Sequence, residues 1–304
     1  MHQIWFAMII IADSGSTKTH WCMLAANGQS SDFLTDGINP FYQTQEAMCN
    51  SVKNQLLPQM GHLMWAGKIT HIFFYGAGCT PEKSPLVQKA LAAVFKDAEV
   101  QVESDMVGAA RGLLQHKKGI ACILGTGSNS CLYDGERIVK NVPSLGFILG
   151  DEGGGAVLGK RLVADLFKNQ LGADLMDLFV QEYGVTQADL IDHVYRQPFP
   201  NRYLASLSKF CAAHLDDKRI YDLVYDHFTE FVVRNLEQYY QDENDVEIED
   251  THTLSVGFVG SIAYYYKSVL QQVMDDMGFA ISKIMQDPID GLKEYHRGNA
   301  VPTM

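Results

Sequence analysis

One pattern occurs twice in the sequence and constrains the fold more than any other feature. An apolar run from Met8 to Ala12 leads into a Gly/Ser/Thr-rich turn, after which extended residues resume at Thr17. The same order returns as a strand at 119–124, a turn at 125–128 and a strand at 130–133. Two apolar strands joined by a short glycine turn are typical of a hairpin. The repetition predicts an α/β chain with two lobes of related architecture and a junction near residue 107.

Periodicity predicts the elements between and after these hairpins. Strands are expected at 69–75, 100–103 and 253–259, and helices at 44–57, 85–98, 104–115 and 262–277. We expect the first helix to end at Pro58, because proline lacks the N–H that a helix interior needs. The chain from 156 to 240 is predicted to be mostly helical, and 242–250 is read as an acidic, solvated loop.

Composition excludes several classes of protein. The chain has 304 residues, which favours two domains, and a net charge of -12, which is a poor match to a nucleic-acid backbone. The apolar run 4–12 is too short to span a bilayer and lacks the basic start of a secretory signal. Six scattered cysteines form no metal-ligand pattern and fit free thiols in a reducing compartment. We therefore expect a cytoplasmic protein without nucleic-acid or membrane partners. Either Met1 or Met8 fits the start of the chain, and a homodimer is compatible with the sequence.

Three turns rich in Gly, Ser and Thr each follow an apolar strand. Glycine lets backbone N–H groups approach an anion closely, and the hydroxyl groups add donors. None of the turns is a Walker A loop or a G-x-G-x-x-G fingerprint, and each alone is most often only a turn. Together they predict a phosphate site. The candidate nucleotide-binding residues are Gly15, Ser16, Thr17, Lys18, Thr126, Gly127, Ser128, Gly257, Gly260 and Ser261.

Two aspartates are candidates for the chemistry of phosphoryl transfer. Asp13 ends the first strand, where its carboxylate could hold hydrated Mg²⁺ beside phosphates or could simply cap a turn. Asp105 begins a helix, where it could be a general base or a residue that interacts with the helix dipole.

Two further segments could bind a polar substrate. The run Gly-Asp-Glu-Gly-Gly-Gly at 150–155 places Asp151 and Glu152 among glycines, which suits either close approach to a ligand or a flexible hinge. Asp151 could bind sugar hydroxyls, and Glu152 could assist it or cap the following helix. Asn39 lies in a Gly-Ile-Asn-Pro turn, where its amide could bond a sugar hydroxyl or stabilise the turn.

These motifs, in this order, resemble the sugar-kinase/Hsp70/actin superfamily and, within it, the N-acetylglucosamine kinase and BadF-type ATPase family. The resemblance runs from Met8 to about Gly278. It implies two ribonuclease-H-like domains with an interdomain cleft, one at 1–107 and one at 108–304. The matched segments are 13–19, 37–40, 104–110, 125–129, 150–153 and 257–261, the last with one expected glycine replaced.

The resemblance also implies an activity, which is ATP-dependent phosphorylation of an amino sugar, at the C6 hydroxyl. Asp105 would be the general base and Asp13 would hold Mg²⁺ through water. The sugar would contact Asn39, Asp105, Gly146 and Asp151. One departure bears on the substrate, because the family's Gly-Gly-Trp-Gly corresponds here to Pro-Ser-Leu-Gly at 143–146, in which only Gly146 matches. The choice between N-acetylglucosamine and glucosamine therefore stays open.

Three alternatives to an amino-sugar kinase remain open. An ATP-hydrolysing activator of a radical dehydratase would need cysteines that hold a bridging iron–sulfur cluster, whereas Cys122 and Cys131 lie on predicted strands. A non-catalytic sugar sensor would not need Asp105 and two intact phosphate turns. A ROK-type glucokinase would carry a cysteine-rich zinc motif, which this sequence lacks.

Overall fold

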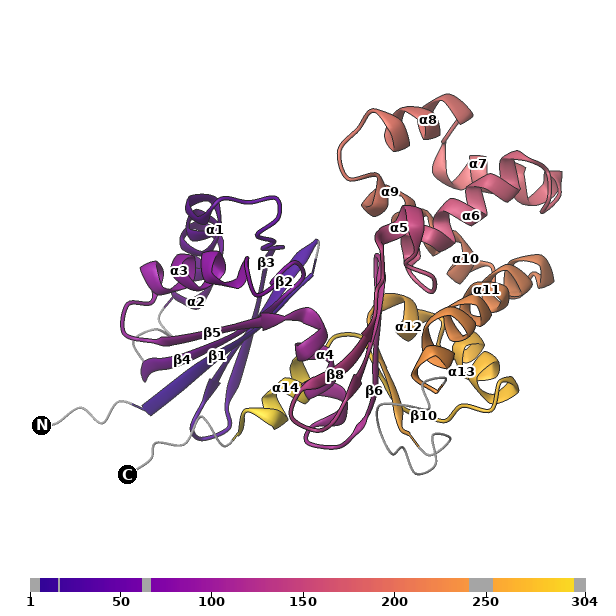
Figure 1. Cartoon of the computed structure of the whole chain (residues 1–304). Helices are drawn as coiled ribbons and strands as arrows, with labels where there is room; N and C mark the ends of the chain where they lie inside the picture. Colours follow the sequence, from indigo (N-terminus) through magenta and orange to yellow (C-terminus); the bar gives the residue numbers. More distant parts are fainter. Residues whose placement is uncertain (1–5, 16, 62–66, 241–253, 298–304) are drawn as a thin grey trace, which may run out of the picture. The chain divides into compact units, whose positions relative to one another are not determined.

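The computed structural model describes residues 6–15, 17–61, 67–240 and 254–297 and divides the chain into two compact units (Figure 1). Unit 1 comprises Met1–Lys117, Gly135–Arg137 and Asp287–Met304, and unit 2 comprises Lys118–Asp134 and Ile138–Gln286. This division differs from the expected junction at residue 107. The helix that begins at Asp105 packs on the sheet of unit 1, and the end of the chain returns to the same unit.

Unit 1 is built on a five-stranded sheet in the order β3-β2-β1-β4-β5. The strands β1, β2 and β3 are antiparallel neighbours, whereas β4 runs parallel to β1 and β5 parallel to β4. The elements are β1 (Phe6–Ser14), β2 (Lys18–Ala25), β3 (Ser30–Asp36), α1 (Gln45–Ser51), η1 (Val52–Leu56), α2 (Leu57–Met60), β4 (Gly67–Gly76), α3 (Ser84–Val94), β5 (Glu99–Ser104), α4 (Asp105–Leu114) and α14 (Ile289–Tyr295).

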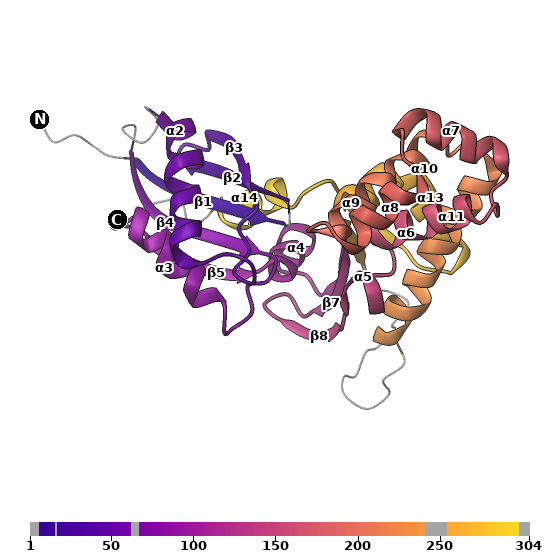
Figure 2. The same cartoon turned by 90° about the horizontal axis from the view of Figure 1, so that it is seen from above.

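The alternation of strand side chains gives unit 1 two cores. Met8, Ile10 and Ala12 of β1 face the side covered by α1 and α3, which lie next to each other (Figure 2). Ile9 and Ile11 face the other side, where α4 and α14 pack. A sheet covered on both faces explains why β1 is a continuous apolar run in the sequence.

The helices α4 and α14 approach each other very closely. A Cβ added to Gly291 would lie 2.0 Å from the carbonyl oxygen of Gly112, so no larger residue fits at this crossing. The side-chain amide of Gln115 also donates to the Gly291 carbonyl, at 3.0 Å. The last described helix is thus fixed to unit 1, although it follows unit 2 in the chain.

Unit 2 repeats the topology of unit 1. Its sheet has the order β10-β9-β6-β7-β8. Read from β8, the third, second, first, fourth and fifth strands of the unit follow one another, as they do in unit 1. The elements are β6 (Gly119–Leu124), β7 (Ser128–Tyr133), β8 (Ile138–Val142), α5 (Gly146–Leu149), α6 (Gly155–Phe167), α7 (Ala173–Tyr183), α8 (Gln187–Tyr195), α9 (Pro200–Leu207), α10 (Lys209–Ala213), α11 (Lys218–Phe231), η3 (Val232–Leu236), η4 (Glu237–Tyr239), β9 (Val256–Val259), α12 (Ser261–Tyr265), α13 (Lys267–Asp276) and β10 (Ile281–Met285). The expected α/β fold with two lobes of related architecture is confirmed.

Several expected boundaries were wrong for identifiable reasons. The helix expected to end at Pro58 continues to Met60, because a π-helical turn precedes Pro58 and places it in the first turn of α2, where no N–H is needed. The helix expected at 85–98 ends at Val94. The acidic segment 242–250 and the first residue of the strand expected at 253–259 lie outside the described residues. No helix in the described part of the chain is long and apolar enough to cross a bilayer.

Candidate active site

The carboxyl ends of three parallel strands meet at one edge of the unit 1 sheet. Ser14 of β1 is in register with Gly76 of β4, which is in register with Ser104 of β5. Asp13 directly precedes Ser14, and Asp105 directly follows Ser104. Both sequence-predicted carboxylates therefore lie at this edge, which is where open α/β sheets bind ligands.

The first phosphate turn and the predicted sugar loop are joined through Ser14. The buried Ser14 hydroxyl bonds the Thr19 hydroxyl at 2.7 Å and donates to the Ile38 carbonyl at 3.0 Å. The Ile38 N–H donates back to Ser14 Oγ at 2.9 Å, and the Gly37 N–H donates to the Thr17 carbonyl at 3.1 Å. The loop that carries Asn39 is thus fixed to the hairpin that carries Thr17 and Lys18, which are exposed.

The turn itself is tight, since the Gly15 N–H donates to the Lys18 carbonyl at 3.0 Å. A Cβ added to Gly15 would meet only that carbonyl oxygen, at 3.9 Å, so open space remains beside the glycine. The candidate Ser16 lies outside the described residues.

Asn39 is held in a defined orientation. Its Oδ1 accepts from the Phe41 N–H at 2.9 Å, and its own N–H donates to the Gln43 side chain at 2.9 Å. The turn role considered from the sequence is therefore present. Gly78 approaches so closely that a Cβ there would lie 2.6 Å from Asn39 Oδ1. The next residue, Cys79, is close enough to Asp105 to sense its charge, so the loop after β4 connects the two candidates.

Asp105 is the first residue of α4 and lies beside its cap. The Ser104 hydroxyl accepts from the Val107 N–H at 3.3 Å, and the Met106 N–H donates to Asp105 Oδ1 at 2.9 Å. Burial raises the pKa of Asp105, whereas hydrogen bonds from the Met106 and Asp105 N–H groups act in the opposite direction. A carboxylate in these surroundings can accept a proton more readily than a solvated one.

The Asp13 carboxylate lies among other acidic groups. Burial, together with the charges of Asp105 and Asp287, raises its pKa to about 7, and His20 and Lys18 oppose the shift only in part. Such a crowded carboxylate fits a bound cation, which would relieve the repulsion. The described residues contain no group of three His, Cys, Asp or Glu arranged to ligate a metal directly.

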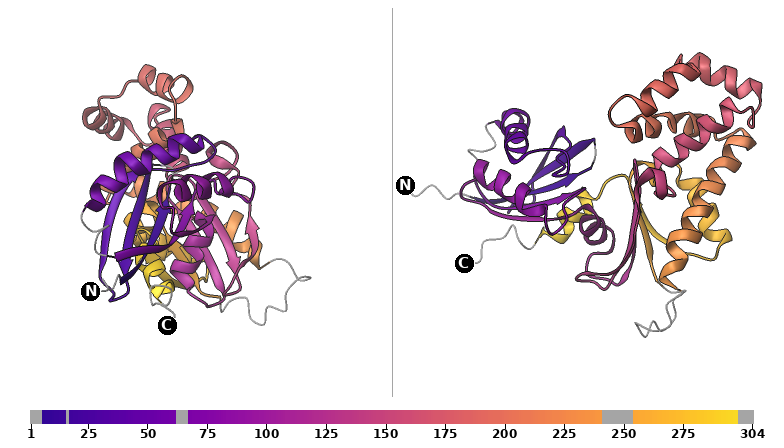
Figure 3. Two further views of the ribbon diagram at one scale, coloured as in Figure 1. Left: turned by 90° about the vertical axis from the view of Figure 1, so that its left-hand side faces the viewer. Right: turned by 45° about the horizontal axis from the view of Figure 1, so that its top comes forward.

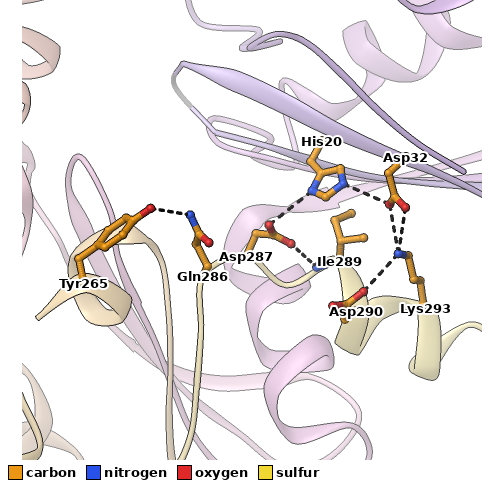
Figure 4. A network of polar contacts seen from close by, with 8 residues as sticks. All are labelled: His20, Asp32, Tyr265, Gln286, Asp287, Ile289, Asp290 and Lys293. Atoms are coloured by element: carbon orange, nitrogen blue, oxygen red, sulfur yellow. Dashed lines mark hydrogen bonds and ion pairs between the residues drawn. The ribbon is translucent and has the colours of Figure 1, made fainter. Parts of the chain in front are cut away.

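A polar network in unit 1 joins β2, β3 and α14 (Figure 4). His20, the hairpin partner of Asp13, contacts Asp287 at 3.5 Å through Nδ1 and Asp32 at 3.2 Å through Nε2. Lys293 of α14 continues the network at 3.1 Å from Asp32. The pKa of His20 is raised by Asp287, and that of Asp287 is lowered by His20. The start of α14 is thus fixed beside the predicted cation site.

Sequence reasoning assigned no role to Asp287 or to His20. Asp287 lies beyond Gly278, where the family resemblance ends. The signal that could have found it is an Asp-Pro pair that follows a strand and begins a helix.

The second phosphate turn, in unit 2, is also closed by the N–H of a glycine. The Gly125 N–H donates to the Gly127 carbonyl at 2.9 Å, and a Cβ added to Gly125 would meet nothing within 4 Å. The start of α6 is bound to this turn, because the Gly155 N–H donates to the Gly125 carbonyl at 2.8 Å and the Ala156 N–H donates to the Thr126 carbonyl at 2.9 Å. The segment 150–155 is therefore packed directly on the hairpin.

Asp151 lies at the centre of that contact. Its backbone has the left-handed φ of 56°, and its N–H donates to the Ser144 carbonyl at 2.8 Å. Burial raises the pKa of Asp151 to about 6, although a hydrogen bond with the Ser128 backbone lowers it. In unit 2 the structure thus brings Asp151 together with Gly127 and Ser128. Gly146 lies exposed at the start of α5, with open space beside it.

The third turn also reaches the second hairpin. Gly260 has a φ of 123°, and a Cβ there would lie 2.3 Å from the Leu124 carbonyl oxygen. Ser261 begins α12 and is exposed. Gly257 differs from these two, because it is buried within β9 between Ala121 and Lys283 of the neighbouring strands.

The cysteines do not form a surface cluster. Cys122 and Cys131 are fully buried in the unit 2 sheet, and all six cysteines are free. This placement does not favour the alternative of a dehydratase activator that holds an iron–sulfur cluster.

Comparison with known proteins adds independent information. No protein-family model matches the chain, and no curated protein matches it. A solved structure from Porphyromonas gingivalis, provisionally named an N-acetylglucosamine kinase, is 45% identical with a TM-score of 0.90, and the alignment covers 97% of this chain and 100% of that one.

Two more distant structures show the fold alone. One is a provisionally named N-acetylglucosamine kinase from Chromobacterium violaceum, with 14% identity, a TM-score of 0.62 and coverage of 96% and 99%. The other is the ethanolamine utilization protein EutJ from Carboxydothermus hydrogenoformans, with 13% identity, a TM-score of 0.53 and coverage of 96% and 88%.

The identity over the full length, the doubled sheet topology and the two glycine hairpins agree with one another. The chain belongs to the N-acetylglucosamine kinase family, within the sugar-kinase/Hsp70/actin superfamily.

Proposed function

We propose that the protein is an ATP-dependent kinase that phosphorylates an amino sugar, of the N-acetylglucosamine or glucosamine type, at the C6 hydroxyl. The observation that carries this proposal is the position of Asp105, a half-buried carboxylate at the carboxyl edge of the unit 1 sheet. The same edge carries the glycine hairpin of 13–19 and the loop of Asn39, fixed to each other through Ser14. The 45% identity to a provisionally named N-acetylglucosamine kinase supports the same substrate class.

Asp105 is the general base in this proposal. It accepts the proton of the primary hydroxyl as that oxygen attacks the γ-phosphorus of ATP in line. The Met106 N–H, at 2.9 Å from Oδ1, holds the carboxylate in one orientation for this transfer. The rest of the acceleration comes from positioning and from stabilisation of charge.

The nucleotide would be held by the two hairpins and by the turn after β9. Backbone N–H and hydroxyl groups of Thr17, Thr126 and Ser128 suit phosphate oxygens, and Gly260 with Ser261 suits the adenosine side. Asp13 would hold Mg²⁺ through water, and the bound ion would neutralise charge on the β- and γ-phosphates. The crowding of Asp13 by Asp105 and Asp287 supports a cation there.

The sugar would be bound by Asn39, Asp105, Gly146 and Asp151. Asn39 Oδ1 accepts from the Phe41 N–H, so the Asn39 side chain would serve the ligand hydroxyl through its amide N–H groups, as a donor. Asp151, a carboxylate, would accept from one or two hydroxyl groups. The six free cysteines fit the cytoplasmic location proposed for the protein. A homodimer stays a prediction.

A coupled ADP-release assay over glucosamine, N-acetylglucosamine, N-acetylmuramic acid and glucose tests the proposal. We expect ADP formation that requires both Mg²⁺ and an amino sugar, and a product phosphorylated at C6 by NMR. Calorimetric binding of a sugar without ADP formation would instead favour a sugar sensor. Release of ADP that no sugar stimulates would remove the kinase assignment.

A further inference from the structure

One face of α11 and η3 contacts the turn that carries Asp151. His227, Phe231 and Arg234 have the spacing i, i+4 and i+7, which places them on one side of a helix. All three reach residues 152–154, directly after Asp151. The helix α11 packs against α6 and α13 in unit 2 (Figure 3, right). The turn is therefore supported by a well-packed element.

Arg234 holds the turn through Glu152. Its Nε lies 3.0 Å from Glu152 Oε1, and the Glu152 side chain is only 12% exposed. Arg234 also pairs with Glu230 at 3.3 Å, and Glu230 pairs with Arg161 of α6 at 3.5 Å. Sequence reasoning left Glu152 as an assistant or a helix cap. In the structure it is the charged anchor of the turn.

Phe231 holds the turn by steric contact. Gly153 has a φ of 81°, and a Cβ there would lie 3.0 Å from both the Phe231 ring and the Leu124 side chain. Leu124 is the last residue of β6 before the phosphate hairpin. The glycine is thus enclosed between the helix and the strand that leads to the hairpin, and a residue with a side chain would be pushed out.

His227 is buried beside the backbone of the same turn. Its exposed fraction is 0%, and in the described part of the chain its ring nitrogens have no hydrogen bond of full geometry, only weak ones to the backbone of Gly153 and Gly154. Burial lowers the pKa of His227 to about 4, whereas hydrogen bonding to the backbone of Gly153 and Gly154 acts in the opposite direction, so the ring is neutral near pH 7. A buried polar group with only weak hydrogen bonds is costly, and a small shift of the turn toward His227 would strengthen them.

We propose that His227, Phe231 and Arg234 are positioning residues that set the orientation of Asp151 through Glu152, Gly153 and Gly154. The consequence for sugar affinity rests on the proposed function, in which Asp151 binds the sugar. The turn is held by a charge pair, by an aromatic ring and by an imidazole that can bond its backbone. Asp151 itself has a left-handed backbone, which needs such support to remain in one orientation.

The first test replaces Arg234 by methionine, which keeps the length of the side chain and removes its charge. The matched control is Arg196→Met, because Arg196 is also exposed and pairs with an acid of its own helix, Asp192, at 3.8 Å. We expect Arg234→Met to raise the KM for the sugar about tenfold, with little change in the KM for ATP or in the melting temperature. Arg196→Met should change none of them, and Glu152→Arg/Arg234→Glu should recover part of the loss.

The second test replaces His227 by phenylalanine, which fills a similar volume without nitrogens. Removal of a weakly bonded buried polar group should leave the melting temperature unchanged or raise it. The KM for the sugar should nevertheless rise severalfold, a result that a purely structural histidine would not give. A variant with wild-type sugar KM would remove His227 from the proposal.

Hydrogen exchange of the backbone amides at 152–156 separates this proposal from the proposed function, because it needs no substrate. Arg234→Met should accelerate exchange there, and Arg196→Met should not. Unchanged exchange together with an unchanged sugar KM overturns the proposal. If the wild-type protein phosphorylates no sugar, the proposed function fails, and the exchange result alone decides whether these residues hold the turn.

Discussion

The carboxylate of Asp151 occupies the space that a side chain at Gly127 would need. A Cβ added to Gly127 would lie 2.5 Å from Asp151 Oδ2, far inside van der Waals contact. Asp151, which is predicted to bind the sugar, is thus in direct contact with Gly127 of the predicted phosphate hairpin. A side chain at residue 127 must therefore move the Asp151 carboxylate.

Gly127→Ala tests this contact. The added methyl group should displace the Asp151 carboxylate, raise the KM for the sugar about tenfold and lower the melting temperature. In an Asp151→Ala background the same substitution should cost much less stability, because the clash is gone. Thermal melts of the four proteins measure this coupling, and purely additive losses would show that the two residues do not contact each other in solution.

Asp105→Asn tests the proposed general base. The amide keeps the shape of the side chain but cannot take the hydroxyl proton, so we expect kcat to fall by about 10²–10⁴. Sugar affinity measured by calorimetry should change little, because an amide can still bond a hydroxyl group. A variant that turns over at a rate near that of the wild type would remove Asp105 from this role.

The strands that form the centre of each sheet could be predicted from the sequence, whereas several edge strands could not. β1 and β6 are buried on both faces and therefore read as continuous apolar runs. β3 has a single buried residue, Thr35, and its polar sequence gives no strand signal. β8 and β10 contain no fully buried residue and were missed for the same reason. An edge strand is specified by its neighbour's backbone more than by its own side chains.

Some residues of the candidate site could likewise be predicted from the sequence, and others could not. Asp13, Asp105 and Asp151 could be found because each interrupts a recognisable glycine or strand pattern. His20 and Asp287 could not, since their contact joins residues that are 267 positions apart in the numbering (287 − 20). Arg234 and His227 have the pattern of ordinary residues of an amphipathic helix, and only their contacts with residues 152–154 set them apart.

The crossing of α4 and α14 gives a prediction about stability. Gly291→Ala would place a methyl group 2.0 Å from the Gly112 carbonyl oxygen, whereas Gly112→Ala would place one 3.0 Å from the Pro288 carbonyl oxygen. We expect Gly291→Ala to cost about 2–3 kcal/mol, because the helices must separate, and Gly112→Ala to cost less. Urea denaturation of both variants measures the difference, and equal losses would contradict the close crossing.

Two buried histidines predict how stability depends on pH. Burial lowers the pKa of His227 to about 4, and burial with the charge of Arg111 lowers that of His296 to about 3. An unfolded chain binds protons at these residues below pH about 6.5 while the folded chain does not. Their contribution to stability is therefore present above pH 6.5 and is lost as the pH falls toward 4.

The carboxyl group of Asp13, with its pKa raised to about 7, acts in the opposite direction over part of this range, because there the folded state holds the extra proton. The decisive quantity is therefore the difference between a variant and the wild type, not the slope of either alone. We expect His227→Phe to lose less melting temperature than the wild type between pH 7 and pH 5, by several degrees. Parallel curves for the two proteins would mean that His227 also takes up its proton in the folded state, and that the ring is less enclosed than its contacts indicate.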